Sequence, residues 1–380
     1  MRIWFRVMTI ALALSVAGPG AALASELAQK QQPKQEPRQA RSAGAGWLVE
    51  NQNSDGGWGA GIWGRDVRAA TSDIATTSLA VMALLRDAKG EPAHRKAIEH
   101  GIRFVVRAVE SSPLEGARLQ GPQGTQPQYK LGRNVDTHFA ALMLGEVSKN
   151  LALDEDERIG SAYDKVLTKV VAAQRADGSF DADGWAPVLS SSVAAQSLYR
   201  AQAQGKKIDL EILERSDGYQ QKLVDAKTGS FDSSAGAGVD LYAAASSLIN
   251  NNDAGKRVAG EDGGRAEQAA RATADSVRRE GDALIAGFGS VGGEEMLSYM
   301  MISDSMAERG GEDWEVWNQK IATQLVATQN ADGSWSGHHC ITSTTFVTAA
   351  AVMTLGSGDA IAAQTAMQGA TQEREVAVLR

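Results

Sequence analysis

Acidic residues, histidines and a cysteine lie at positions where the sequence predicts helices to begin. Carboxylic acids and histidines can transfer protons, and Cys, His and carboxylate side chains also suit Zn²⁺. These positions include three of the five histidines of the 380-residue chain and its only cysteine. The candidate catalytic residues are Glu294, Glu295 and His138; the candidate ligand-binding residues are Asp73, Asp136, Asp240 and His338; the candidate metal ligands are His339 and Cys340.

Each group of candidates has a structural alternative. Asp is favoured immediately before a helix, where it accepts hydrogen bonds from the first amides, so N-capping explains the three aspartates without a ligand. Cys340 can be a small buried hydrophobic residue beside histidines that line a polar pocket. The residue types suggest one possible cofactor, Zn²⁺, but their spacing does not support a zinc site. The adjacent His338, His339 and Cys340 cannot all face one ion from a regular helix.

One short motif occurs three times, each time between an amphipathic helix and a mostly apolar one. Before the last copy, Trp314, Trp317, Ile321 and Leu325 recur three to four residues apart, as one face of a helix requires. Glycine frees the turn, glutamine can bond to orphan amides of the next helix, and the aromatic residue packs over the hairpin. The motif is therefore structural. Its copies are Gln52…Asp55-Gly56-Gly57-Trp58, Gln174…Asp177-Gly178-Ser179-Phe180 and Gln329…Asp332-Gly333-Ser334-Trp335.

Together with three less regular copies, the motif divides the chain into six helical hairpins. The second helix of each hairpin is apolar nearly all round, and such a helix must be buried on all sides. The second helices therefore belong to an inner ring and the first helices to an outer one. The predicted fold is all-α, a single closed (α/α)6 toroid of six helical hairpins without a sheet. The N-termini of the inner helices, which carry the candidate residues, should meet at one mouth.

The three motif copies resemble the Gln-Trp repeat of squalene-hopene cyclases and the related repeat of protein prenyltransferase β subunits, the terpenoid cyclase and prenyltransferase superfamily of α/α toroids. The resemblance covers about Gly44 to Leu355 and is closest to exported bacterial repeat proteins of unknown activity. It implies a toroid with an isoprenoid-like ligand. It also makes zinc worth considering, because protein prenyltransferases bind a catalytic zinc through Asp, Cys and His at the starts of inner helices.

The sequence departs from both enzyme families. It has no Asp-x-Cys zinc motif and only one toroid, and its nearest acidic run, Asp154 to Glu157, precedes an outer helix instead of an inner one. Negative charge is favourable at such a helix start, which explains the run without catalysis. A diphosphate substrate would need a basic cluster, for which Lys130 and Arg133 are the only candidates. The chain therefore lacks part of the residue set that each of these two enzyme reactions requires.

The predicted domain organisation is a signal peptide at 1–24, a flexible linker at 25–43, the toroid at 44–356 and a polar C-terminal tail at 357–380. Arg2 and Arg6 precede a short apolar run that ends in small residues, as in secretory signals, so we expect export to the periplasm or cell exterior. No later segment looks long and apolar enough to span a membrane. The net charge is -8 with scattered basic residues, which argues against nucleic-acid binding. The oligomeric state cannot be predicted.

The main functional hypothesis is that the toroid binds an isoprenoid or another small apolar ligand in its central cavity, with or without transforming it. The alternatives are a non-catalytic extracellular interaction module and a polysaccharide-acting toroid enzyme with Asp or Glu pairs as acid and base. Aromatic residues above a polar floor would favour the isoprenoid. An acidic groove with exposed Trp would favour sugar, and a filled cavity would favour the module.

Overall fold

The computed structural model describes residues 36–62, 70–87, 92–150, 157–258, 260–286 and 291–378. Three predicted features lie outside these ranges: the signal peptide at 1–24, residues 25–35 of the linker and the acids at 154–156. Phe288, the aromatic residue expected in the turn of the fifth hairpin, lies outside them as well. All helices discussed below belong to the unit that begins at Pro37.

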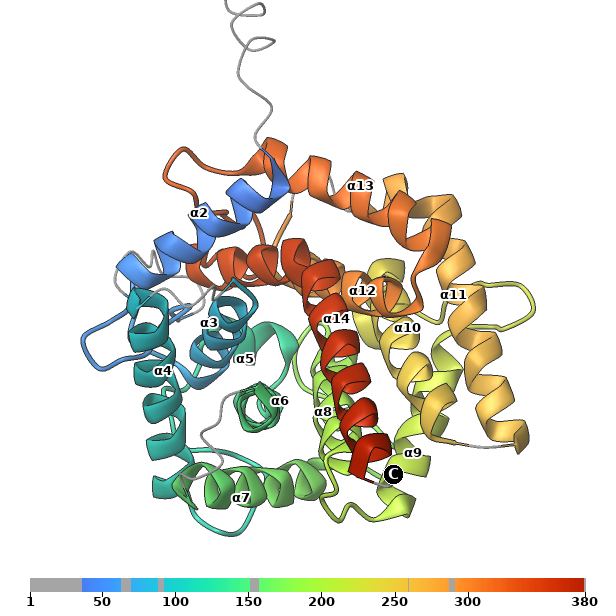
Figure 1. The fold of residues 1–380 in the computed structure, drawn as a ribbon, viewed down its shortest axis with the longest axis horizontal. Helices are drawn as coiled ribbons and strands as arrows, with labels where there is room; N and C mark the ends of the chain where they lie inside the picture. Colours follow the sequence, from blue (N-terminus) through green and yellow to red (C-terminus); the bar gives the residue numbers. More distant parts are fainter. Residues whose placement is uncertain are drawn as a thin grey trace, which may run out of the picture. The chain divides into compact units, whose positions relative to one another are not determined.

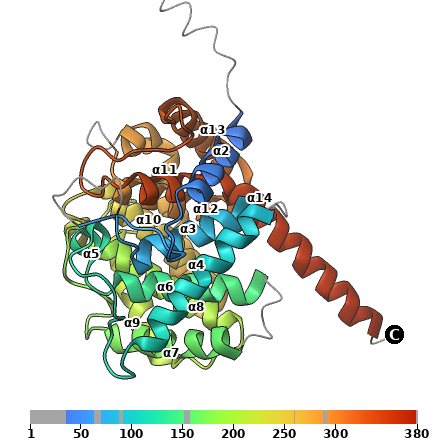
Figure 2. The same ribbon diagram turned by 90° about the vertical axis from the view of Figure 1, so that its left-hand side faces the viewer.

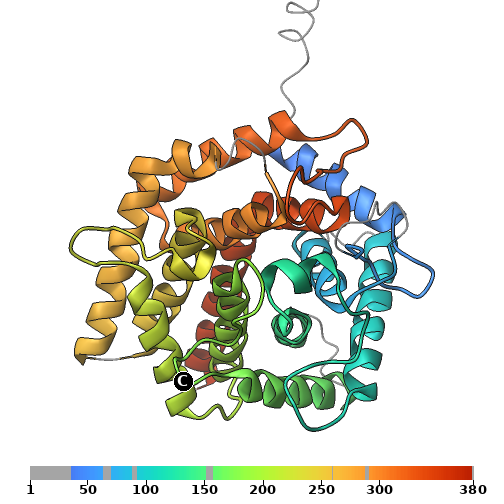
Figure 3. The ribbon, with the colours of Figure 1, turned by 180° about the vertical axis from the view of Figure 1, so that it is seen from behind.

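Twelve of the described helices form six pairs, each an outer helix followed by an inner one (Figure 1). The inner helices contact one another in chain order, and the last contacts the first, so the ring is closed, as Figure 3 shows from behind. The described residues form isolated β-bridges but no strand, and the predicted all-α (α/α)6 toroid is confirmed. The outer helices are α2 (Pro37–Glu50), α4 (Pro92–Ser111), α7 (Glu157–Ala173), α9 (Leu210–Gln220), α11 (Gly260–Ala286) and α13 (Gly311–Thr328). The inner helices are α3 (Ile74–Asp87), α6 (Val135–Asn150), α8 (Pro187–Ala203), α10 (Asp240–Arg257), α12 (Gly293–Arg309) and α14 (Thr344–Val378).

Hydrophobic periodicity separates the two rings. In α8, every residue from Val188 to Tyr199 is buried, because neighbours surround the helix on all sides. In α4, burial follows a single stripe at helical spacing that includes Ile98, Ile102, Val105 and Val109. The connection between α4 and α6 carries one further short helix, α5 (Gln126–Leu131).

The three motif copies adopt the same turn. Their glycines Gly56, Gly178 and Gly333 have φ values of 89°, 93° and 90°, a left-handed conformation that favours glycine. In each copy, Oδ1 of the motif aspartate accepts a hydrogen bond from the amide two residues later, as from Ser179 to Asp177 at 3.0 Å. The aspartate therefore orders its own turn.

The motif glutamines join each hairpin to the next one, although not in the predicted way. They donate to backbone carbonyls of the next outer helix instead of accepting from its amides: Gln52 donates to Ala97 O at 2.8 Å and Gln174 donates to Ile212 O at 2.7 Å. The reason is that the motif meets backbone carbonyls in the first part of that helix instead of its free amides, and the amide nitrogen of glutamine is a donor.

The last motif copy closes the ring by making the same contacts with the first helix. Gln329 donates to Ala40 O at 2.8 Å and to Gly333 O at 2.7 Å. Trp335 is 2% exposed, and a Cβ at Gly44 would lie 2.7 Å from its ring, so α2 can approach this closely only with glycine there. The contact between the last hairpin and the first one thus has the same form as the contact between successive hairpins.

Buried charges reinforce this closure. Arg41, which is 2% exposed, donates to Asp87 Oδ1 at 2.9 Å and to Asp359 Oδ2 at 2.9 Å. One arginine of α2 therefore holds the end of α3 and the middle of α14, and its burial is tolerated because its charge is paired.

Gln329→Ala is expected to lower the free energy of unfolding by about 1–3 kcal/mol, because two backbone carbonyls lose their donor. Urea unfolding followed by circular dichroism measures the change. Gln319→Ala, which removes the same side chain from an exposed position on α13, is the control. Equal unfolding midpoints for the two variants would contradict the joining role of Gln329.

Two predicted boundaries need correction. Helix α2 begins at Pro37 with Ala40 and Arg41 buried, so residues 37–43 of the predicted linker belong to the toroid. Helix α14 continues to Val378, so the predicted tail at 357–380 is largely helical, and Figure 2 shows this end projecting from the ring. Within α14, Thr344–Ala363 is long and apolar enough to cross a membrane, contrary to the expectation for later segments. However, 61% of the window is buried inside the toroid, and core helices often pass this test.

Candidate functional site

The start of α12 lies against the segment that precedes α14. Gly293 N donates to Ile341 O at 2.9 Å, and His338 N donates to Val291 O at 2.8 Å. A Cβ at Gly292 would lie 2.4 Å from the carbonyl oxygen of His339, so only glycine permits this approach. The contact brings together two adjacent pairs of residues from distant parts of the sequence, as predicted for this mouth of the ring: Glu294 and Glu295, and His339 and Cys340.

Glu295 is fully buried and accepts three hydrogen bonds. Its Oε1 accepts from the Tyr242 hydroxyl at 2.7 Å and lies 3.2 Å from His339 Nε2, while its Oε2 accepts from Gly292 N at 2.8 Å. Burial and the neighbouring carboxylates raise the pKa of Tyr242, so this hydroxyl remains a donor. The imidazole of His339 is 24% exposed. Glu295 is therefore a buried support that orients a partly exposed histidine.

Glu294 is the acid whose proton affinity changes most clearly in this group. It is 1% exposed, and its Oε2 accepts from Ile341 N at 3.1 Å. Burial raises its pKa to about 7, because the charged form loses hydration that one backbone amide does not replace. Glu294 can therefore hold a proton near neutral pH.

Two further side chains complete the group, which we call the acid cluster: Lys130, Tyr242, Glu294, Glu295, His339 and Cys340. Lys130 hydrogen-bonds the Cys340 thiol, whose pKa rises to about 11 through burial and the charge of Glu294. Lys130 is 4% exposed, and its Nζ lies 4.8 Å from the ring centroid of Trp185. Cys340 has φ of 55°, a left-handed conformation that is rare outside glycine. A reactive thiolate is disfavoured here.

His138 does not belong to the acid cluster, which corrects its predicted role. It is fully buried between α6 and α8, where Nδ1 lies 3.0 Å from Ser190 Oγ and the ring makes an edge contact with Phe180. Burial lowers its pKa to about 3, so it stays neutral. One turn of helix separates His138 from the mouth, and its side chain turns toward the next hairpin.

Asp73 and Asp136 form a second buried acidic pair with a structural role. Asp73 caps α3, because its Oδ1 accepts from Thr76 N at 2.8 Å and its Oδ2 accepts from Ala60 N at 2.7 Å. Asp136 accepts from Ala75 N at 3.1 Å, so it bridges α6 to α3. Burial raises their pKa values to about 6 and about 7, respectively. The N-cap alternative thus explains Asp73 fully, and Asp136 caps the neighbouring helix instead of its own.

Asp240 and His338 lie at the mouth but are exposed and outside the acid cluster. Asp240 is the first residue of α10 and not its N-cap, which is Val239. Within the described ranges, no three His, Cys, Asp or Glu side chains are placed to share a metal ion. The predicted zinc ligands are also engaged otherwise: His339 lies against Glu295, and Cys340 lies beside the ammonium group of Lys130, which would repel a cation.

Sequence reasoning missed Lys130 as a cluster member and missed Tyr242 altogether. Tyr242 could have been predicted in the same way as the acids, because it lies in the first turn of an inner helix. Lys130 belongs to α5, inside the irregular connection, and nothing in the local pattern places it beside Cys340.

The stability of the protein should fall as pH rises from about 4.5 to about 7. The folded state binds the Glu294 proton more tightly than the unfolded chain does, because the pKa of this carboxyl is about 7 when folded and 4.5 ordinarily. This contribution to stability is therefore complete at low pH and disappears as pH passes the folded pKa. The shift corresponds to about 3 kcal/mol. Urea unfolding at pH 5 and 7.5 should show a smaller decrease for Glu294→Gln than for the parent, and equal decreases would contradict the burial argument.

The fold and these contacts define an (α/α)6 toroid with buried acids at one mouth. A solved structure with this fold is the GH76A α-1,6-mannanase from Salegentibacter sp. HEL1_6, which matches over 86% of this chain and 100% of that chain with a TM-score of 0.57 and 11% sequence identity. This low identity shows the fold alone. No protein-family model and no curated protein matches the sequence. The toroid implied by the resemblance is supported, whereas membership of the prenyltransferase and cyclase superfamily is not.

Proposed function

We propose that this protein is a polysaccharide-acting enzyme that hydrolyses glycosidic bonds at the acid cluster. The observation that carries the proposal is the pairing of two different kinds of group at one mouth. Glu294 is a buried acid that keeps its proton to about pH 7, and His339 is a partly exposed imidazole held by the Glu295 carboxylate. A general acid and a separate general base are what glycoside hydrolysis requires.

In the proposed reaction, Glu294 donates its proton to the oxygen of the leaving sugar as the glycosidic bond breaks. His339 accepts a proton from the water that attacks the anomeric carbon, and Glu295 stabilises the imidazolium that forms. Glu295 is thus a positioning residue, in the way that a buried carboxylate orients a catalytic histidine elsewhere. The products are two shorter sugar chains, and one water is consumed.

A glycan fits the mouth better than the isoprenoid ligand does. The side chains of the inner helices are buried, both the hydroxyls of Ser190 to Ser192 on α8 and aromatic rings such as Phe139 and Tyr299, so these residues offer no open apolar lining to an isoprenoid. Large aromatic surfaces lie on the outside of the mouth instead, where Trp185 is 58% exposed and Tyr129 is 48% exposed. The fold neighbour is an α-1,6-mannanase, an enzyme that acts on a polysaccharide.

The test is hydrolysis of defined polysaccharides by the purified chain. α-1,6-Mannan is the first substrate because of the fold neighbour, followed by dextran and xylan, and the assay counts newly formed reducing ends. We expect turnover of at least one of them, with activity that falls above about pH 7 as Glu294 loses its proton. Unchanged reducing ends with all three substrates would contradict the proposal.

A non-catalytic interaction module is the second candidate, and the burial of the acids favours it. Glu294 and Glu295 are at most 1% exposed, and both accept hydrogen bonds from the backbone of the same mouth, as purely structural acids would. The two candidates differ in one result: a module binds its partner without cleaving it.

A further inference from the structure

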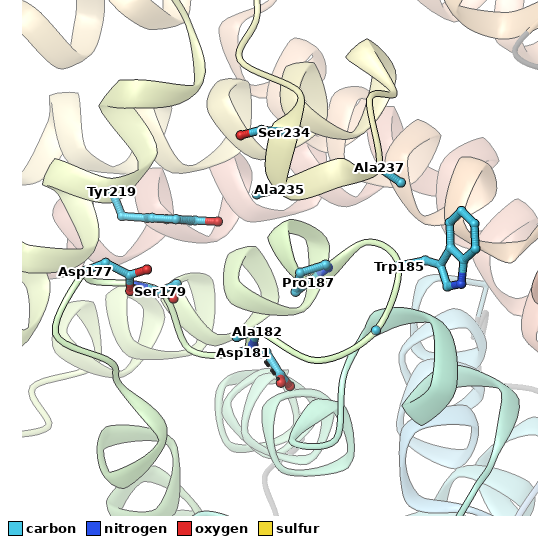
Figure 4. A pocket seen from close by; sticks show the side chains of 11 residues that line it. Asp177, Ser179, Asp181, Ala182, Trp185, Pro187, Tyr219, Ser234, Ala235 and Ala237 are labelled. Carbon is cyan, nitrogen blue, oxygen red and sulfur yellow. Dashed lines mark hydrogen bonds between the residues drawn. The ribbon is translucent and has the colours of Figure 1, made fainter.

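A groove of about 470 Å³ lies between the third and fourth hairpins, next to the acid cluster. Its sides come from the turn before α8, from α9 and from the short 3-10 helix η2 (Ser234–Gly236). Figure 4 shows Tyr219 and Trp185 at its two ends, with Pro187 and Ala235 between them. Asp177 and Ser179 lie beside Tyr219 (Figure 4). The groove thus alternates aromatic, apolar and polar surface along its length.

The lining combines the two kinds of surface that sugars require. Aromatic faces pack against the C–H faces of pyranose rings, and carboxylates and hydroxyls bond to their hydroxyl groups. Folding does not require the indole of Trp185 to be here, since it is 58% exposed while Trp58, Trp317 and Trp335 are all buried. Asp177 is exposed; burial raises its pKa, but the hydrogen bonds from Ser179 outweigh this and lower it overall, so it is an ionised acceptor.

One end of the groove, at Trp185, adjoins Lys130 of the acid cluster. Backbone amides of Trp185 and Ala186 donate to Lys130 O at 2.8 and 2.9 Å, and the Trp185 ring lies 4.8 Å from Lys130 Nζ. Lys130 in turn bonds to Cys340 beside Glu294. The Trp185 end of the groove is therefore the end nearest the acid cluster.

We propose that this groove is a binding subsite for several consecutive units of a neutral polysaccharide, with Trp185 as its stacking platform. The inference rests on the proposed function for the class of ligand. We specify neutral chains because the groove includes Asp177 and Asp181 and none of its described lining residues is basic, so the groove would repel a polyanion.

The experiment measures retardation of the purified chain in native gels that contain α-1,6-mannan, dextran, xylan or polygalacturonate. The variant is Trp185→Ala, and the control is Leu210→Ala, which truncates a side chain that is 56% exposed on α9 and does not line the groove. For at least one neutral polysaccharide, the dissociation constant of Trp185→Ala should rise at least about tenfold. The control should stay within about twofold of the parent.

Three results would overturn the subsite: no retardation by any neutral polysaccharide, equal retardation of Trp185→Ala and parent, or stronger retardation by polygalacturonate. The outcome is separable from that of the proposed function. Trp185-dependent binding without new reducing ends would leave the subsite intact and refute hydrolysis. Hydrolysis by the parent together with unchanged binding by Trp185→Ala would support the proposed function and refute the subsite.

Discussion

Glu294→Gln is expected to lower kcat on the hydrolysed polysaccharide by about 10²–10⁴-fold, because glutamine cannot donate the proton that the leaving sugar needs. The change keeps side-chain volume, and the amide can still accept from Ile341 N, so the fold and the binding of polysaccharide should persist. Initial rates of reducing-end formation, compared at equal protein concentration, measure the loss.

The matched control for this variant is Glu312→Gln, which makes the same chemical change at an exposed position in the first turn of α13. It should retain the parental rate. If Glu294→Gln retains it as well, Glu294 is a structural acid and the general acid lies elsewhere. If activity is lost only because the variant unfolds, the far-ultraviolet circular dichroism spectrum will show it.

Trp335→Ala is expected to destabilise the protein by about 3–5 kcal/mol, as truncation of a large core side chain does. The indole is 2% exposed, its Nε1 donates to Leu325 O at 2.8 Å, and its ring fills the space above Gly44 of the first helix. Removing it leaves a cavity at the closure of the ring and takes one of its donors from Leu325 O. Urea unfolding at fixed pH measures the change.

Trp185→Ala is the control for that experiment, because it removes the same side chain from a site that is 58% exposed. It should change stability by less than about 1 kcal/mol. Similar losses in the two variants would mean that the packing role assigned to the motif aromatic is wrong.

The fold could be predicted from the sequence because each hairpin repeats the same local rules. The glycines of the motif mark its turns, the helical spacing of Trp317, Ile321 and Leu325 marks an outer helix, and inner helices are apolar all round. The ends of the toroid were harder to place. In the sequence, Arg41 has the character of a linker residue, because its partners Asp87 and Asp359 belong to distant helices and meet it only in the folded chain.

The candidate site could be predicted only in part. Four of its residues follow from the rule that inner-helix starts share one mouth, and Glu294, Glu295, His339 and Cys340 do meet. Side-chain direction was not available from the sequence, and for that reason His138 was assigned to the wrong group. Long-range partners were not available either, since Lys130 reaches Cys340 across 210 positions through a connection without periodicity.

Gln329 and Gly44 have a consequence for how the molecule comes apart. In an open stack of repeats, the first and last units have one neighbour each and need specialised outer faces. Here the last motif holds Ala40 of the first helix in the way that the first motif holds Ala97, so every hairpin has a neighbour on both sides. No unit can fray without opening two interfaces, and hydrogen exchange in α2 should be as slow as in helices far from either terminus.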